Sequence, residues 1–305
     1  MDGFMWVSSA KGVIKMIKFI TDSASDIPKE YEKELDIKIM PIPITIDEKG
    51  YYERLDFTPD EFYKILNDSE QIPVTSHINM LQFGEEYSKA FEAGYDEIIH
   101  VTISSTGSAM FEAAQTAREM FYNKDESRRE KIKIHVIDSK TYSYGYGFAV
   151  VEGAKMAREG KTVEEILAFM NDYFSRVEVW FSVCSLKFAK KSGRISVAAS
   201  FVGEMLGLRP IISIIDGKMK IVDKVRGDKN ISLKLAQVMN ENIDENMKGY
   251  SILVGAVNNM GDELEEICAE FKDKKLSGKF KVGASVAINS GPEVLGIAFL
   301  GKNRR

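Results

Sequence analysis

Short apolar runs alternate with amphipathic segments through the first half of the chain. The runs at 17–20, 96–103 and 132–139 have the composition of buried strands, whereas the segments at 80–93 and 147–158 have helical periodicity. Neighbouring parallel strands need a crossover connection, which is usually a helix. The alternation therefore predicts βαβ units and a layered α/β domain with a parallel sheet.

Local signals indicate where further helices and an irregular strand begin. Asp26 is expected to cap a helix that has Pro28 in its first turn, and Thr58 forms a capping box with Glu61. The segment 37–46 has strand composition, but its two prolines restrict it to a sheet edge or an irregular strand.

The second half of the chain has an antiparallel character. Asp216 and Gly217 separate two β-rich runs, which is a strong sequence signal for a hairpin. Helical patterns at 230–247 and 262–272 alternate with further strand-like runs. Those runs are 250–257, 279–288 and 295–301. We therefore expect a mixed sheet covered by helices.

These patterns predict two domains that meet near the stretch from Phe174 to Glu178. We expect residues 1–16 to form an extension or a tag remnant. Residues 17–176 are expected to form an N-terminal α/β/α domain with a parallel sheet, and 177–305 a C-terminal α+β domain with a mixed sheet. The absence of a repeat or a low-complexity linker favours domains that abut closely and leave a cleft, where ligands commonly bind.

Composition and charge exclude several classes of partner. The chain has 305 residues, with 41 basic and 46 acidic side chains and a formal net charge of −5, so it offers no basic face for nucleic acid. No apolar run approaches the roughly 20 residues of a membrane-spanning helix. Cys184 and Cys268 lack the spacing of a zinc site or a disulfide framework, which fits buried thiols in a reducing cytoplasm.

Glycine and histidine patterns in the chain match catalytic motifs poorly. The segment 153–162 resembles a phosphate-binding loop, but six residues separate its glycines where the loop needs four. The segment 144–150 lacks the third glycine of a dinucleotide fingerprint, so its glycines favour helix packing, with close ligand approach as the alternative. His77, His100 and His135 include no metal-binding pair, and we expect the last two to be hydrogen-bonded core residues. A metal enzyme or a hydrolase is therefore disfavoured.

Small oxygen-bearing side chains follow three predicted strands at the points where those strands end. In an open α/β sheet, ligands bind outside the carboxyl ends of the strands, so these side chains are expected to converge. Capping of the following helices is the alternative role for each pair. The pairs are Asp22-Ser23, Ser104-Ser105 and Asp138-Ser139.

A fourth pair of hydroxyls, Thr75 and Ser76, precedes another helix and extends this cluster. No lysine or arginine lies beside this pair. Neutral donors and helix-start amides suit one small negative charge such as a carboxylate. A triphosphate would be expected to need nearby cations or Mg²⁺ as well.

Eight short motifs follow one another in the order found in a known family. On these motifs, which lie between Ile17 and Gly301, the chain resembles the DegV family of bacterial fatty-acid-binding proteins. The motifs are ITDSASDIP, PVTSHIN, ISSTGSAMFEAA, VIDS, SLKFAKKSGRIS, LGLRPIISIIDGKM, KVRGDK and NSGPEVLGIAF.

The resemblance implies a two-domain protein that holds one long-chain fatty acid in a tunnel between its domains, without a cofactor, a metal or catalysis of its own. In the best-understood branch of the family, a dihydroxyacetone-kinase-like fatty acid kinase phosphorylates the presented carboxylate, and the acyl phosphate serves phospholipid synthesis. The resemblance thus implies a cytoplasmic lipid carrier whose partners are the fatty acid and this kinase, with transient contact to a membrane surface.

Residues of the site follow from the resemblance position by position. Thr75 and Ser105 match the family's contacts to the carboxylate. The hydroxyls of Ser23, Ser76 and Ser104 belong to the same cluster of strand-end and helix-start residues, and we expect them to complete the head-group site.

Further positions match, or depart from, the mouth of the family's tunnel. Arg194 and Arg226 match arginines that serve the kinase or the incoming phosphoryl group. Asn289 stands where the family usually has a histidine on the head-group side. Met110 and Phe111 also depart from the family pattern and are expected to make the entrance more apolar.

Two other functions are open, and the departure at Asn289 favours the first of them. One is a sensor or carrier of another apolar carboxylate that has no kinase partner. The other is a phosphate-ligand enzyme that uses the same serines, with Asp22 and Asp138 on a metal ion.

Overall fold

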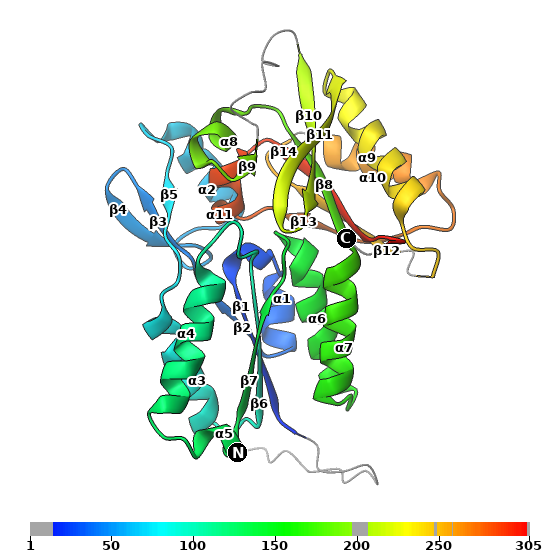
Figure 1. Ribbon diagram of the computed structural model, residues 1–305. Helices are drawn as coiled ribbons and strands as arrows, with labels where there is room; N and C mark the ends of the chain where they lie inside the picture. The colour runs from blue at the N-terminus through cyan, green and yellow to red at the C-terminus, as the bar shows by residue number, and fades with distance from the viewer. Residues whose placement is uncertain (1–14, 197–206, 247–248, 258, 304–305) are drawn as a thin grey trace.

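The computed structural model describes residues 15–196, 207–246, 249–257 and 259–303 (Figure 1). Within them the strands form a parallel sheet in the N-terminal domain, a larger mixed sheet in the C-terminal domain and a small three-stranded sheet. Residues 1–14 of the predicted extension lie outside the described residues.

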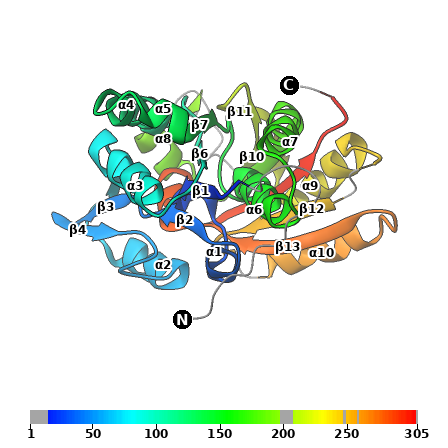
Figure 2. The ribbon, with the colours of Figure 1, turned by 90° about the horizontal axis from the view of Figure 1, so that it is seen from below.

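Four parallel strands form the centre of the N-terminal domain in the order β2-β1-β6-β7. Helices α3 and α4 cover one face, and α6 and α7 cover the other (Figures 1 and 2). The strands are β1 (Ile17–Asp22), β2 (Ile37–Met40), β6 (Glu97–Thr102) and β7 (Lys133–Asp138). The helices are the 3-10 turn η1 (Ser23–Ser25), α1 (Lys29–Glu34), α3 (Met80–Glu92), α4 (Met110–Asn123), α5 (Arg128–Lys131), α6 (Tyr144–Arg158) and α7 (Val163–Arg176). The predicted α/β/α layering is confirmed.

The C-terminal domain has a mixed sheet in the order β13-β12-β14-β8-β10-β11-β9. Its inner pairs are antiparallel and its two outermost pairs are parallel. The strands are β8 (Val177–Val183), β9 (Ile195–Ser196), β10 (Leu208–Ile215), β11 (Lys218–Arg226), β12 (Gly249–Val254), β13 (Lys275–Lys281) and β14 (Val294–Leu300). The helices are α8 (Lys187–Ser192), α9 (Lys229–Asn242), α10 (Met260–Ala269) and α11 (Ala284–Ser290). The predicted hairpin about Asp216 and Gly217 joins β10 to β11.

A small subdomain from the N-terminal half of the sequence packs against the C-terminal domain (Figure 1). Its elements are β3 (Pro43–Ile46), β4 (Lys49–Tyr52), α2 (Pro59–Asp68) and β5 (Val74–Thr75). Ile44 and Phe62 of this subdomain share a hydrophobic cluster with Ala284 and Ala287 of α11. The chain therefore leaves the parallel sheet after β2, joins the other layer, and returns at α3.

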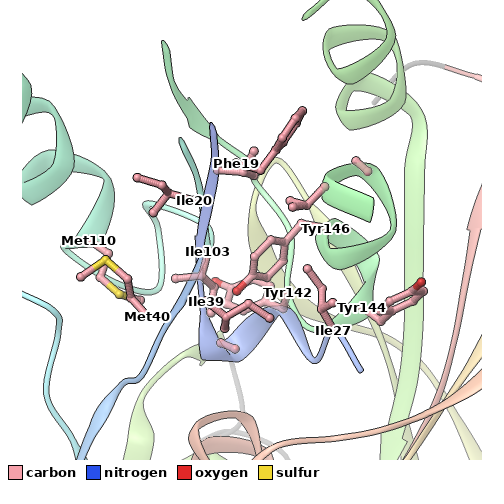
Figure 3. Packing of buried hydrophobic residues seen from close by; sticks show 14 of the residues in the cluster. Phe19, Ile20, Ile27, Ile39, Met40, Ile103, Met110, Tyr142, Tyr144 and Tyr146 are labelled. Carbon is pink, nitrogen blue, oxygen red and sulfur yellow. The ribbon is translucent and has the colours of Figure 1, made fainter. Parts of the chain in front are cut away.

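The largest hydrophobic cluster extends from the parallel sheet into the mixed sheet. It contains Phe19 of β1 and Val179 of β8. Tyr144, at the start of α6, stacks on Phe280 of β13 with the two ring centroids 3.4 Å apart. Figure 3 shows this cluster around Phe19 and Tyr144. The two domains consequently share a core.

Asp26 does not have the predicted role of a helix cap. Helix α1 begins at Lys29 after Pro28, whereas Asp26 has a left-handed backbone with φ of 51°. Its buried carboxylate accepts hydrogen bonds from the hydroxyl of Ser143 and from the backbone N–H of Gly283. These partners lie far away in the sequence, so the local pattern could not reveal them.

The predicted strand at 279–288 is wrong in its second half. Strand β13 ends at Lys281, and α11 follows from Ala284. The prediction of an edge or irregular strand at 37–46 is confirmed, since this segment divides into the edge strand β2 and the separate strand β3. The predicted capping box of Thr58 is also present. Gly147 lies where an added Cβ would meet the carbonyl oxygen of Ser25, which confirms the packing role of this glycine.

The expectation of a core histidine is confirmed for His100 on β6, whereas His135 on β7 is hydrogen-bonded but only half-buried. His100 is fully buried, and its Nδ1 lies 2.7 Å from the hydroxyl oxygen of Tyr87. The ring of Phe83 contacts it edge-on. Burial lowers the pKa of His100 to about 3, so its imidazole is neutral at pH 7. His135 is hydrogen-bonded to Glu97, with 2.7 Å between Nε2 and Oε2.

Lowering the pH from 7 to 5 should decrease the free energy of unfolding by about 2 kcal/mol through His100 alone. Because its pKa is depressed in the fold, the unfolded chain takes up a proton that the native protein does not. The loss of unfolding free energy begins as the pH falls below the pKa that His100 has in the unfolded chain. Urea unfolding of the wild type and of His100→Gln at both pH values measures it: the variant should lose about 2 kcal/mol less. Equal losses in the two proteins would contradict this role.

Candidate ligand-binding site

A cavity of about 840 Å³ lies between the two domains, at the carboxyl ends of β1 and β6. The mixed sheet and the segments facing it supply an apolar wall. That wall includes Ile42, Ile103, Val179, Phe181, Ile214, Met219, Leu253, Val282, Val286 and Val294. The end of β5, several loops and the last turn of α11 supply polar groups from Thr75, Ser76, His77, Asn79, Ser105, Ser108, Arg194 and Asn289. The size and lining are those of a site for a small, mostly apolar molecule.

Thr75 and Ser105 both lie in the lining of this cavity. Thr75 ends β5, which pairs with β3, and among the described residues no group bonds to its hydroxyl. Ser105 follows β6, and its hydroxyl donates to Oδ2 of Asp138 over 2.6 Å. The neighbouring parallel strands β6 and β7 end side by side, which places Asp138 against this loop. The cavity therefore brings together two of the hydroxyls that the sequence indicates.

The hydroxyl of Ser104 points to the other domain and not into the cavity. Its Oγ lies 3.0 Å from the carbonyl oxygen of Gly217, at the tip of the β10-β11 hairpin. The hydroxyls of Thr106 and Tyr142 donate to the same oxygen. We call these three hydroxyls the Gly217 socket. The socket fixes the hairpin, whose flanking residues Ile214 and Met219 line the cavity.

Ser23 also lies outside the cavity lining. It is buried, and its hydroxyl donates to Oε2 of Glu53 over 2.5 Å. Oγ of Ser23 itself accepts from the backbone N–H of Ile42 over 3.0 Å. Ser23 thus joins the end of β1 to the small subdomain.

Two buried carboxylates attach the first turn of α11 to the N-terminal half of the chain. Asp26 accepts from the N–H of Gly283, and Glu53 accepts from the N–H of Ser285, each over 2.9 Å. Burial raises the pKa of Asp26 well above its ordinary value, and the nearby charge of Glu53 raises it further. Glu53 could not be predicted from the sequence, because nothing near it in the chain indicates a buried acid. Its binding to α11 positions Asn289, one turn further along that helix.

The remaining predicted residues are divided between the cavity and the surface. Arg194 and Asn289 line the cavity, where Asn289 donates to the carbonyl of Ser285 over 2.7 Å. Arg226 is exposed at the end of β11 and is not part of the lining. Met110 contributes to the lining, whereas Phe111 does not.

The aspartates of the alternative metal site have protein partners. Burial raises the pKa of Asp22 to about 6, and its Oδ1 accepts from the hydroxyl of Tyr146 over 2.6 Å. Asp138 is bound by Ser105. In the part of the chain that the structure describes, no group of three or more metal-ligating side chains is found. None of the helices in that part is long and apolar enough to cross a membrane.

Comparison with known proteins places this architecture in a family. The model of the DegV family, described as uncharacterised protein, matches residues 16–302. The chain belongs to the DegV family. A DegV domain-containing protein from Caldanaerobacter subterraneus subsp. tengcongensis is 30% identical over 291 residues, covering 94% of this chain and 99% of that protein.

Solved DegV structures have the same two-domain fold. A fatty acid (stearic acid)-binding protein from Eubacterium ventriosum is 26% identical, with a TM-score of 0.85 over 94% of this chain and 99% of that chain. A DegV family protein from Thermus thermophilus, described by its fatty acid binding, is 24% identical, with a TM-score of 0.82 over 93% and 99% of the two chains. The predicted fold, a parallel-sheet domain beside a mixed-sheet domain, is thereby confirmed.

Replacing Gly217 with alanine should lower the free energy of unfolding by about 2 to 3 kcal/mol. The added Cβ would lie 2.7 Å from Oγ of Ser104, on a backbone with φ of 75°. Gly227→Ala is a matched control, since Gly227 has φ of 78° but no atom within 4 Å of an added Cβ. Urea unfolding should show a loss of about 1 kcal/mol in the control. Equal losses would mean that the Gly217 socket contributes little.

Proposed function

We propose that this DegV family member binds one long-chain fatty acid, with the tail in the apolar part of the cavity and the carboxyl group at Thr75 and Ser105. The observation that carries the proposal is a large cavity with an apolar wall and two hydroxyls at strand ends. The similarity to the stearic acid-binding protein from Eubacterium ventriosum supports it.

The tail provides most of the binding free energy in this proposal. Burial of each methylene contributes about 0.8 kcal/mol, so a chain of about 16 carbons gains roughly 10 kcal/mol before the costs of association. A neutral hydrogen bond contributes about 1 kcal/mol. The hydroxyls therefore fix the position of the head group more than they set the affinity.

Three of the five predicted head-group residues keep their place in the proposal. Thr75, Ser76 and Ser105 line the cavity. The hydroxyls of Ser23 and Ser104 already bond to Glu53 and Gly217, so we assign them to the attachment of the domains.

Native mass spectrometry of the purified protein, followed by extraction and identification of the released molecule, tests this function directly. We expect one fatty acid of roughly 14 to 18 carbons per chain, because a tail of this length gains enough burial to survive purification. A nucleotide or a sugar phosphate in its place would contradict fatty acid binding and favour the phosphate-ligand enzyme.

The double variant Thr75→Ala with Ser105→Ala should bind palmitate about 30-fold more weakly than the wild type. Loss of two hydrogen bonds of about 1 kcal/mol each gives this factor. Ser88→Ala with Thr116→Ala is the matched control, since those hydroxyls bond to backbone carbonyls within α3 and α4. Calorimetric titration measures the affinities, and an unchanged affinity in the first variant would count against the head-group site.

We further propose that the protein works in the cytoplasm as a non-catalytic carrier and presents the carboxyl group to a dihydroxyacetone-kinase-like fatty acid kinase. The family resemblance supports this role, and Arg194 and Asn289 are the polar residues of the cavity that would face such a partner. A carrier or sensor of another apolar carboxylate, without a kinase, is the competing role.

Arg194→Ala should leave palmitate affinity within about twofold of the wild type and reduce acyl phosphate formation by the kinase at least about tenfold. The expected reason is that a guanidinium at the mouth stabilises the phosphoryl group or the docked partner. Arg129→Ala provides the control and should leave both quantities unchanged, since Arg129 of α5 is exposed and lies outside the cavity lining. Unchanged acyl phosphate formation by Arg194→Ala would favour the role without a kinase.

A further inference from the structure

The hydrogen bond between Ser105 and Asp138 has a defined direction. Oγ of Ser105 lies 2.6 Å from Oδ2 of Asp138. An ionised carboxylate has only acceptors and a serine hydroxyl has only one proton, so Ser105 donates that proton to Asp138. The backbone N–H groups of Ser105 and Lys140 donate to the other carboxylate oxygen, each over 3.0 Å, and hold Asp138 in place.

This direction determines what Ser105 offers to a ligand. With its proton committed to Asp138, its oxygen can only accept a hydrogen bond from the cavity. An ionised head group has no proton to donate. It would be repelled by the lone pair on Oγ of Ser105 and by the negative charge of Asp138 behind it. Thr75, whose hydroxyl has no partner among the described residues, can still donate.

We propose that Asp138 makes the cavity selective for head groups that carry a proton, so that a fatty acid binds together with one proton. The carboxyl carbonyl accepts from Thr75, and the carboxyl hydroxyl donates to Ser105, which donates to Asp138. The carboxyl group and Asp138 thus share one proton and one negative charge as a coupled pair. This inference rests on the proposed function.

The charged residues around Asp138 leave its negative charge without an ion-pair partner among the described residues. A proton on the ligand head group would avoid a second negative charge beside it. A smaller pocket of about 140 Å³ on the other side of Ser105 contains Asp138, Lys140 and Asp216. No ion pair joins Asp138 to Lys140, although both are described. On the cavity side the titratable or charged lining residues are His77, Glu112, Tyr142 and Arg194. Arg194 could compensate an ionised head group, which is the competing arrangement.

Calorimetric titration of palmitate into lipid-free protein at pH 8, in two buffers of different ionisation enthalpy, counts the protons taken up on binding. All proteins carry His77→Gln to remove the histidine of the lining. We expect uptake of about one proton, and an affinity that falls about tenfold for each pH unit above the pKa of the free acid. Hexadecan-1-ol, which keeps its proton at every pH, should bind with an affinity independent of pH.

Asp138→Asn should abolish the proton uptake, because the amide can donate to Ser105 and release the serine proton for an ionised carboxylate. Asp216→Asn is the matched control: it removes a charge from the same small pocket, and proton uptake should remain.

Zero uptake in the protein with an intact Asp138, while palmitate binds, would overturn this inference alone. Equal uptake with and without Asp138 would overturn the role of Asp138. No binding of palmitate at any pH would overturn both this inference and the proposed function. If Asp138→Asn does not fold, the proton count and the comparison with hexadecan-1-ol still decide the question.

Discussion

The structure depends on one constraint: polar groups at the carboxyl edge of the parallel sheet are buried by the second domain and must find hydrogen-bond partners there. The hydroxyls of Ser104, Thr106 and Tyr142 are satisfied by a single carbonyl at the tip of the β10-β11 hairpin. The carboxylates of Asp26 and Glu53 are satisfied by the start of α11. Buried polar contacts therefore fix how the two domains meet.

The cavity lies between the two domains at a place where the hydroxyl of Thr75 has no hydrogen-bond partner among the described residues. Much of its apolar wall comes from the mixed sheet, and the hydroxyls of Thr75 and Ser105 come from the end of β5 and from the loop that follows β6. A mostly apolar molecule with one small polar end complements this surface. Fatty acid binding thus follows from the way the domains are joined, with the same strand ends serving both attachment and recognition.

The sequence predicts the helices and strands of this fold well. It predicts the hydrogen bonds between residues far apart in the chain poorly. Strand composition and helical spacing identify β6, α3 and the hairpin, since these signals lie within a few residues. Ser104 and Ser105 look alike in the sequence, yet the first bonds to Gly217 and the second lines the cavity. Gly217 lies 113 positions from Ser104, so only the tertiary fold assigns the two hydroxyls their roles. The same holds for Asp26, whose partner Gly283 belongs to α11.

The path of the chain through the small subdomain has a mechanical consequence. The backbone passes between the two layers after β2, again before α3, and a third time between α7 and β8. A pair of bodies joined by one segment of chain can rotate about a single hinge. Here three covalent crossings and a hydrophobic cluster shared by both layers restrict such a rotation. Opening the cavity by rotation of the two bodies would have to break this shared core, whereas movement of the loops that line the cavity would leave the core intact.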